Sequence, residues 1–376
     1  MAGIYIHIPF CRRKCHYCNF YSVASSRYRK EFMDGITEEL YLRRKYMGER
    51  ELQTIYFGGG TPSYLEVRHI QKILEEIRKY HKVSSSAEIT LEANPDDLNP
   101  AVIKSYRNAG INRLSIGIQS FREEDLQYLN RIHSAARAEE SIREALDAGF
   151  DNLSIDLIYG IPTLSSAQWE ENIEKAISFG IPHISAYSLT VEPNTALDVL
   201  IHKKKLAAPD EDNSIEHFRI LLRKMKEHGY EHYEISNFCK PGHYSRHNSQ
   251  YWNGEMYLGI GPSAHSYDGF SRQWNVGSII EYADRIRRGE RFFETEELTV
   301  EQHYNEFIMV RLRTMWGCDI AKLREKFGET LAAEFSSRAM NYISSGQIEE
   351  AGGIYTLTDE GKLFADGIAS DLFLES

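Results

Sequence analysis

The sequence predicts an α/β fold: a partial (β/α)6 barrel built on a parallel sheet, followed by a winged-helix-like C-terminal α+β domain. Six short runs rich in Val, Ile, Leu, Tyr and Thr end in Gly, Pro or Asn, as strands do. Segments of helical period separate them, and strand–helix alternation favours a parallel sheet. Six units are too few for the usual closed barrel of eight, so we expect an open barrel with its site at the carboxyl ends of the strands.

The strand runs also predict where a site would form. The expected strands are 4–9, 54–59, 88–94, 113–119, 152–160 and 183–190. Helical periodicity is clear in 66–80, 136–148 and 166–179. Polar or glycine-rich sequence lies at the strand ends: CRRKCHYC follows the first, GGGTP the second, EAN ends the third and Q ends the fourth. We therefore expect these residues to lie together at the end of the barrel where the strands have their carboxyl ends.

The chain divides into three predicted regions. Residues 1–200 form the partial barrel, and 201–295 extend it in a less regular segment rich in Tyr, His and Asn. Residues 296–376 read as helices, then a β-hairpin and a helix, which is winged-helix-like. Residues 301–376 hold seven Lys and Arg against thirteen Asp and Glu, so we expect a cap or docking module there rather than DNA binding.

Composition excludes several classes of protein. The 376 residues carry a net charge of −11, from 44 basic and 55 acidic side chains, which argues against broad attraction to nucleic acid or anionic membranes. No apolar run is long enough to span a bilayer, and the first ten residues lack the layout of a signal peptide. We expect a cytoplasmic protein, with peripheral contact at a membrane left open.

Three of the five cysteines form a cluster with spacing C-x3-C-x2-C, at Cys11, Cys15 and Cys18. In a reducing compartment such a group indicates metal or catalytic chemistry rather than disulfides. Structural zinc usually takes four ligands, whereas three thiolates can hold a [4Fe–4S] cluster and leave one iron open to a small molecule. A structural zinc site or plain surface thiols remain the alternatives. The basic residues 12–14 should lower the thiol pKa values.

The cysteine spacing, on a loop after the first strand, resembles the radical S-adenosylmethionine (SAM) superfamily. Further motifs, in order over nearly the whole chain, resemble the family of oxygen-independent coproporphyrinogen III oxidase (HemN) and the heme chaperone HemW. These motifs are YIHIPFCRRKCHYC, YFGGGTPS, LEANPDDL, RLSIGIQSF, LNRIHS, IDLIYGIPT, YEISNF and SRHNSQYW. The resemblance implies a [4Fe–4S] cluster whose open iron binds the methionine end of SAM.

The resemblance also implies a set of SAM-contacting residues. They are Tyr5, Tyr17, Gly59, Gly60, Thr61, Glu92, Gln119, Arg131 and Asp156. Their chemistry suits this role, because glycines let a ligand approach the backbone and a carboxylate can accept two ribose hydroxyls. Purely structural roles remain the alternatives to SAM contact. These are a tight turn at the glycines, a solvated strand end at Glu92, an Asp156–Arg131 salt bridge, and core packing for the two tyrosines.

A second motif, H-N-x-x-Y-W, implies heme as a further ligand, through His247, Tyr251 and Trp252. A neutral imidazole is a good axial ligand for heme iron, so His247 is the candidate ligand, and the two aromatic rings offer flat faces to a macrocycle. The alternative is a core histidine in a polar turn. Cys239, His243 and His265 are weaker candidates for a second ligand, and Cys318 is expected to be a buried apolar residue.

Departures from the oxidase pattern favour the chaperone branch. The oxidase has a further cysteine two residues after its third, where this chain has Phe20, and an N-terminal extension, whereas the first strand here begins near residue 4. We expect a protein that carries heme to acceptors such as respiratory apoproteins, with flavodoxin or ferredoxin as electron donor. Coproporphyrinogen oxidation, or another radical SAM reaction on heme, is the alternative, so whether the chain is an enzyme stays open.

Overall fold

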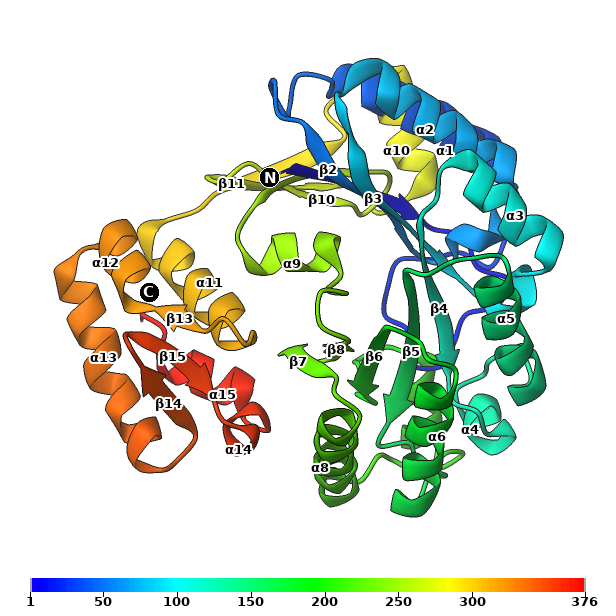
Figure 1. Ribbon diagram of the computed structural model, residues 1–376. Coiled ribbons are helices and arrows are strands. Elements are labelled where there is room, and N and C mark those ends of the chain that lie inside the picture. Colours follow the sequence, from blue (N-terminus) through cyan, green and yellow to red (C-terminus); the bar gives the residue numbers. More distant parts are fainter. Residues whose placement is uncertain (1, 375–376) are drawn as a thin grey trace.

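The computed structural model describes residues 2–374 and contains one large sheet and one small one (Figure 1). The large sheet has twelve strands in the order β12-β11-β10-β9-β1-β2-β3-β4-β5-β6-β8-β7. Strands β9 and β1 to β6 run parallel, and the others are antiparallel to their neighbours. Within the described residues no hydrogen bonds join β12 to β7, so the barrel is open, as the sequence predicts.

The strands of the large sheet include all six that the sequence predicts. Their bounds are β1 Ala2–Ile8, β2 Leu52–Gly59, β3 Val83–Ala93, β4 Arg113–Gln119, β5 Leu153–Tyr159, β6 His183–Ser188, β7 Glu231–Glu234, β8 Asn237–Cys239, β9 Met256–Ile260, β10 His265–Tyr267, β11 Ser271–Asn275 and β12 Phe293–Glu297. The small sheet contains β13 Cys318–Asp319, β14 Ile348–Ala351 and β15 Ile354–Leu357.

Helices lie mostly along the outer side of the large sheet (Figure 1). Their bounds are α1 Arg29–Leu42, α2 Val67–Tyr80, α3 Pro100–Ala109, α4 Glu123–Tyr128, α5 Ala135–Asp147, α6 Ser166–Ser178, α7 Ala196–His202, α8 Glu211–Glu227, α9 Arg246–Trp252, α10 Ile279–Arg287, α11 Val300–Leu312, α12 Ile320–Phe327, α13 Glu329–Ser344, α14 Asp359–Lys362 and α15 Ala365–Asp371. Short 3-10 turns cover Pro62–Tyr64 and Pro95–Asp97. Helix α9 is an exception, because it packs against β1 and β2 on the inner side of the sheet.

Local sequence explains the helices that alternate with the strands. Helix α2 buries Ile70, Ile73, Leu74 and Ile77, which recur every three or four residues on one face. Helix α6 begins with a capping box in which Ser165 and Gln168 exchange side-chain and backbone hydrogen bonds. The burial of such helix faces against the outer side of the parallel strands builds the main apolar core, whose buried side chains run from Ala2 to Ile279.

The segment expected to be less regular, 201–295, has more regular structure than the sequence predicts. Strands β9 to β11 extend the large sheet beyond β1, and β9 pairs with β1 in parallel. They escape detection because they are short, and β11 also carries Arg, Gln and Asn among its residues. The region therefore completes the sheet on the far side of the first strand.

The C-terminal region has a core of its own, with buried side chains from Tyr304 to Leu372. Helices α11, α12 and α13 precede the β14–β15 hairpin, which matches the predicted order of helices and hairpin. It joins the rest of the chain through a bridge between Glu234 and Thr314 and a hydrogen bond from the Ile235 amide to the Arg313 carbonyl. None of the described helices is long and apolar enough to cross a membrane.

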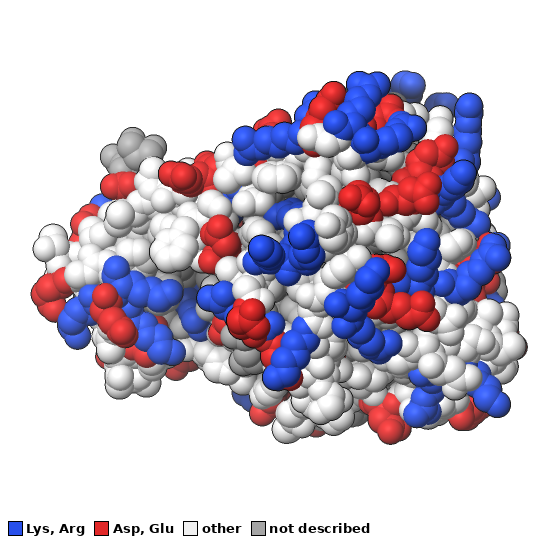
Figure 2. Space-filling model, turned by 90° about the horizontal axis from the view of Figure 1, so that it is seen from above, with Lys and Arg blue, Asp and Glu red and all other residues white. Residues whose placement is uncertain are grey.

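Charges on the surface are mixed. On the face shown in Figure 2, Lys and Arg side chains are interspersed with Asp and Glu. This face is unlike the continuous basic surface with which proteins bind nucleic acid.

Candidate functional site: a cysteine-lined cavity at the carboxyl ends of the strands

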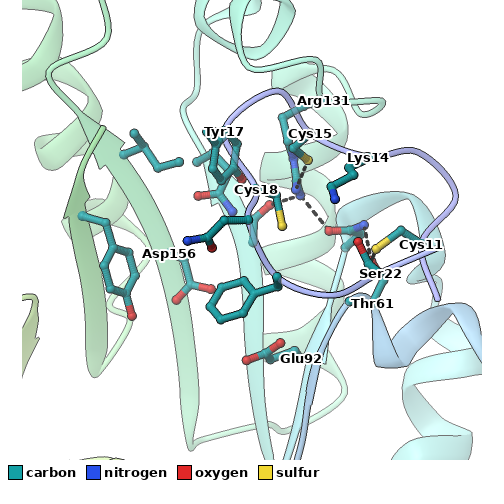
Figure 3. Close-up of a pocket in the computed structure, with 18 of the residues that line it drawn as sticks. Cys11, Lys14, Cys15, Tyr17, Cys18, Ser22, Thr61, Glu92, Arg131 and Asp156 are labelled. Atoms are coloured by element: carbon teal, nitrogen blue, oxygen red, sulfur yellow. Dashed lines mark hydrogen bonds between the residues drawn. The ribbon is translucent and has the colours of Figure 1, made fainter. Parts of the chain in front are cut away.

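A cavity of about 440 Å3 opens at the carboxyl ends of the parallel strands (Figure 3). The loops and strand ends of all six predicted strands contribute to its lining. From the predicted site it brings together Cys11, Cys15, Tyr17, Cys18, Gly59, Gly60, Thr61, Glu92, Gln119, Arg131 and Asp156. Residues separated by up to about 145 positions thus share one wall, as the carboxyl-end rule for such folds requires.

The cysteine loop is held in place by bonds to its neighbours. The Thr61 hydroxyl lies 3.4 Å from Cys11 Sγ, and Arg131 Nη1 lies 3.4 Å from Cys15 Sγ. The backbone of the loop is tied to the chain before α5, because Asn130 Nδ2 donates to the Lys14 carbonyl at 2.9 Å. The three thiols are therefore presented to the cavity on an anchored loop rather than on a free surface segment.

All three thiols of the motif line the cavity, Cys11 buried and Cys15 and Cys18 half-buried. Among residues 2–374, no three His, Cys, Asp or Glu side chains are close enough together to hold one metal ion. Three thiols at one cavity match the number of thiolates that a [4Fe–4S] cluster needs when one of its irons is left open.

The predicted effect of the basic residues on the thiols is wrong for two of them. Burial raises the pKa of Cys11 and of Cys18, and this outweighs the nearby positive charges. Arg12 is instead engaged by Asp97, with Nε 2.6 Å from Oδ1. Burial thus favours the protonated form of Cys11 and Cys18 until a metal replaces their protons.

The GGG turn packs closely against β1 and the cysteine loop, and Gly59 and Gly60 also line the cavity. Gly59 has φ of 105°, which favours glycine. A Cβ built on Gly60 would lie 2.8 Å from the Ile8 carbonyl oxygen and 3.1 Å from Cys11 Sγ. The turn is therefore both a tight turn and a close-approach surface, so the two interpretations of the glycines are compatible.

Two carboxylates line the cavity deep in the sheet. Glu92 accepts a hydrogen bond from the Tyr56 hydroxyl at 2.8 Å, and burial raises the pKa of Glu92 to about 7. Burial also raises the pKa of Asp156 to about 6, although Ser115 donates to this carboxylate at 3.3 Å. Such shifts are typical of carboxylates that await a hydrogen-bonding or cationic ligand.

Arg131 does not pair with Asp156. No ion pair within 4 Å joins the two among the described side chains, which removes the salt-bridge alternative. Arg131 Nη2 donates at 2.7 Å to Asn94 Oδ1 and to the Gly117 carbonyl, while its buried Nε has no hydrogen-bond partner in the described structure. A buried donor without a partner indicates a missing acceptor, such as a bound carboxylate.

Of the remaining predicted SAM contacts, Gln119 and Tyr17 line the cavity and Tyr5 does not. Gln119 lines it from a left-handed backbone conformation with φ of 67°, which is rare for this residue type and is concentrated at functional sites. Tyr17 lines the cavity, whereas Tyr5 does not and stacks on Tyr56 with ring centroids 6.1 Å apart. Tyr5 therefore lies behind Glu92, in the packing position that was the alternative for it.

The H-N-x-x-Y-W motif forms helix α9, and none of its residues lines the cysteine-lined cavity, although Asn248 shares a smaller neighbouring cavity with Glu92 and Asp156. His247 is buried and uses both ring nitrogens: Nδ1 lies 2.7 Å from the Thr54 hydroxyl and Nε2 lies 2.8 Å from the Tyr251 hydroxyl. Burial lowers the pKa of His247 to about 3, so its imidazole is neutral. Tyr251 and Trp252 line a second cavity, of about 620 Å3.

The weaker candidates lie apart from this group. Cys239 is buried on β8, where burial raises its pKa to about 12, and Cys318 is buried on β13 as expected. His265 on β10 packs beside Trp274, with ring centroids 6.3 Å apart. His243 lies in the loop between β8 and α9, where its amide donates to Lys240.

Several residues at the cavities escape prediction from the sequence. Tyr56 and Ser115 hold predicted side chains in place but belong to ordinary strands, whereas Asn94, which binds Arg131, falls in the EAN stretch predicted to lie at the site. Apart from Tyr251 and Trp252, which belong to the H-N-x-x-Y-W motif, the lining of the second cavity comes from segments far apart in the chain and has no local signal. Only the residues within compact motifs could be found in advance.

Comparison with family models places two regions of the chain. Residues 5–176 match the radical SAM superfamily, and residues 298–364 match the HemN C-terminal domain. The matched regions include the cysteine loop with strands β2 to β5 and most of the C-terminal unit described above. Radical SAM domains imply a [4Fe–4S] cluster and SAM, which agrees with the thiols and the partnerless arginine nitrogen at the cavity.

Comparison with whole proteins extends the match to the full chain. The heme chaperone HemW of Bacillus subtilis (strain 168) is 37% identical over 372 residues, which covers 98% of each chain. HemW of Escherichia coli (strain K12) is 33% identical over 382 residues and covers 99% of this chain and 98% of that one. Among solved structures, coproporphyrinogen III oxidase (HemN) from Escherichia coli, described as a radical SAM enzyme, superimposes with a TM-score of 0.85 at 20% identity, covering 99% of this chain and 90% of that one.

Proposed function

The chain belongs to the radical SAM superfamily and, within it, to the family of the heme chaperone HemW, and from this we propose that it binds heme and delivers it to acceptor proteins. The observation that carries the proposal is identity of 33–37% over nearly the whole chain with proteins of that name. The likeness to the oxidase, at 20% identity, supports the fold alone.

The residues proposed to hold the cofactors are those at the cysteine-lined cavity. Cys11, Cys15 and Cys18 would each bind one iron of a [4Fe–4S] cluster. When bound, the reduced cluster supplies a single electron to the sulfonium of SAM. The chain's own part is to keep the three thiols anchored and to shield them within a cavity whose floor is buried.

The proposed SAM contacts follow from the chemistry of the side chains around the cavity. The turn at Gly59, Gly60 and Thr61 offers backbone to the methionine end, and the partnerless Nε of Arg131 suits its carboxylate. Glu92, once ionised, can accept both ribose hydroxyls. The remaining proposed contacts are Tyr17, Gln119 and Asp156, which line the cavity, and Tyr5, which supports them from behind.

Phe20 supports carriage of heme over oxidation of coproporphyrinogen. It stands where the oxidase pattern has a further cysteine, and its side chain lines the cavity with 62% of its surface exposed. An apolar ring at the mouth cannot replace a thiol in metal binding or proton transfer. Coproporphyrinogen oxidation is therefore the second candidate, and the relatives named above do not favour it.

The segment proposed to bind heme is α9 with His247, Tyr251 and Trp252. Tyr251 and Trp252 present aromatic side chains to the second cavity. Ligation of iron by His247 requires the Tyr251 hydroxyl to leave Nε2, because this nitrogen is already hydrogen bonded. The motif therefore contributes aromatic contact directly and a ligand only after a side-chain rotation.

We also propose where the protein acts and with which partners. The acceptors would be respiratory apoproteins at the membrane, and a flavodoxin or ferredoxin would reduce the cluster. The protein would work in the cytoplasm, with peripheral contact at the membrane during transfer. The mixed charge on the surface in Figure 2 fits contact with proteins better than adhesion to an anionic bilayer.

The test is transfer of heme to a defined acceptor. The cluster-reconstituted protein is loaded with hemin, freed of excess, and mixed with respiratory membranes from heme-depleted cells. Recovery of heme-dependent oxygen uptake faster than with the same amount of hemin on serum albumin supports the proposal. Uptake no faster than with albumin, or no stoichiometric binding of hemin at all, overturns it.

A further inference from the structure

The second cavity lies between the end of α9, the strands β9 to β11 and the first helices of the C-terminal unit. Its volume of about 620 Å3 is in the range, roughly 300–1,000 Å3, in which proteins hold cofactors and drug-sized ligands. Seven aromatic residues contribute to its walls: Tyr251, Trp252, Tyr257, Tyr267, Phe270, Phe307 and Phe327. Walls of this kind suit a large flat apolar ligand.

We propose that this cavity is the docking site of the heme macrocycle and that His303 of α11 is the axial ligand of its iron. The inference rests on the proposed function and deepens it, because it assigns the ligand and the propionate contacts to residues outside the H-N-x-x-Y-W motif. Three independent observations support it: a free imidazole, a set of cations and an exposed apolar rim.

His303 presents an imidazole that is available to a metal. It lies on the face of α11 that also carries Phe307 and Val310, spaced by four and three residues, and all three line the cavity. Its ring nitrogens have no hydrogen-bond partner among the described residues, unlike those of His247, which have two. Burial, Lys326 and Arg272 lower the pKa of His303, which keeps the ring in the neutral form that binds iron.

The charges in the cavity fit a ligand with two carboxylates. Three cations line it, Arg272, Arg311 and Lys326, against two acids, Glu255 and Glu306. Arg272 is engaged by Glu306, and no carboxylate lies within 4 Å of the Lys326 ammonium in the described part of the chain. Lys326 sits over the Phe307 ring, with its nitrogen 5.6 Å from the ring centroid.

Arg311 is the third cation, and its guanidinium is already oriented. Nη1 donates to Asn253 Oδ1 at 3.0 Å, which leaves other donors of the guanidinium free to reach a propionate. A surplus of one positive charge beside an apolar wall is the arrangement that recognises an amphiphilic dianion such as heme.

The rim of the cavity carries apolar side chains that are exposed to solvent. The exposed fractions are 79% for Phe270, 59% for Val300 and 38% for Met309, and all three line the cavity. Exposed apolar residues that gather around one concave site indicate a binding partner. A macrocycle seated in the cavity would cover them.

The test is titration of the full chain with hemin, followed by absorption and electron paramagnetic resonance spectra. Three variants are compared: His303→Gln, Lys326→Gln and, as matched control, His202→Gln, whose side chain is 79% exposed on α7. His303→Gln should shift the Soret band and weaken binding about tenfold or more, the usual cost of a central contact. Lys326→Gln should weaken binding by a few-fold with an unchanged spectrum, and the control should match the parent.

The outcomes separate this inference from the proposed function. If the parent protein fails to bind hemin, the proposed function fails. If the parent binds but His303→Gln keeps its spectrum and affinity, this assignment is overturned. Loss of the Soret band in His247→Gln with an unaltered His303→Gln would likewise overturn it and move the ligand to α9. Circular dichroism of each variant shows that the fold persists, and Lys326→Gln tests the cavity even if His303→Gln fails to fold.

Discussion

The Nε2 atom of His247 lies 2.8 Å from the hydroxyl of Tyr251, and this contact stands between the two cavities. Tyr251 lines the second cavity, while the His247 ring packs against Tyr56 with centroids 4.9 Å apart. Tyr56 in turn donates to Glu92 at the cysteine-lined cavity. One chain of contacts thus connects the proposed SAM contacts with the proposed heme site.

Tyr251→Phe should reveal what His247 does. The substitution leaves a buried ring nitrogen without a partner, which should lower the free energy of unfolding by about 1–3 kcal/mol. If His247 acts only through Tyr251, hemin binding should keep its Soret maximum, as measured by titration. Tighter binding with a new Soret maximum would instead mean that the hydroxyl had blocked a ligand.

Cys15→Ala should abolish the cluster. Only two thiols would remain on the loop, and three are needed to hold a [4Fe–4S] cluster with one open iron. Iron and sulfide analysis after anaerobic reconstitution should fall from about four of each per chain to near zero, with loss of the brown absorption. Cys239→Ala is the matched control, because this thiol is buried on β8 away from the loop. Full iron content in Cys15→Ala would refute the assignment.

Gly60→Ala should block the methionine end of SAM or distort the cysteine loop. Its Cβ would lie 2.8 Å from the Ile8 carbonyl oxygen, 2.9 Å from that of Phe10 and 3.1 Å from Cys11 Sγ, so the backbone must shift. We expect at least a tenfold loss of SAM affinity by equilibrium dialysis, equivalent to about 1.4 kcal/mol. The control is Gly367→Ala on α15, where a Cβ meets nothing within 4 Å. Equal affinity in the two variants would contradict the proposed approach of SAM.

SAM affinity should depend on pH through Glu92. Its pKa of about 7 in the empty site means that the carboxylate is mostly protonated at pH 6 and ionised at pH 8. Since the ionised form accepts the ribose hydroxyls, affinity should rise about tenfold between these values, one pKa unit on either side. Glu92→Gln should flatten this rise, leaving the smaller contribution of Asp156, whose pKa is about 6. A rise of the same size in the variant would show that another group is responsible.

Ionisation of Glu92 should lower the stability of the folded protein, whereas it raises the affinity for SAM. Its folded pKa is raised above the unfolded value, so it favours folding fully at low pH, and this contribution is lost as pH rises through about 7. The melting temperature of the SAM-free protein should therefore fall between pH 5 and pH 8 by more than that of Glu92→Gln. Differential scanning fluorimetry measures both.

Anaerobic turnover separates the two candidate functions. Reconstituted protein with SAM, a strong reductant and coproporphyrinogen III should yield no protoporphyrinogen by chromatography. The reason is that Phe20 occupies the position of the oxidase's further cysteine. Product in stoichiometric amount would establish the oxidase activity and overturn the preference for a carrier.

The sequence predicts the parallel strands and the cavity they share because both depend on local pattern. Each of the six strands is long and apolar enough to be recognised, and Cys11 and Gly60 fall in motifs directly after two of them. Strand β9 was missed since its partner β1 lies about 250 residues away. The position of His303 at the second cavity is likewise not predictable from its own helix, because β11 and α9, which also line this cavity, lie elsewhere in the chain.

The pairing of β9 with β1 has a consequence for how the chain folds during synthesis. The first strand lies in the interior of the sheet, between β2 and β9, and not at its edge. One edge of the strand at residues 2–8 therefore lacks its hydrogen-bond partner until residues 256–260 have left the ribosome. By then more than two thirds of the chain has been synthesised. A nascent chain stalled before β9 should expose this strand edge to chaperones and to aggregation, however complete the cysteine loop beside it already is.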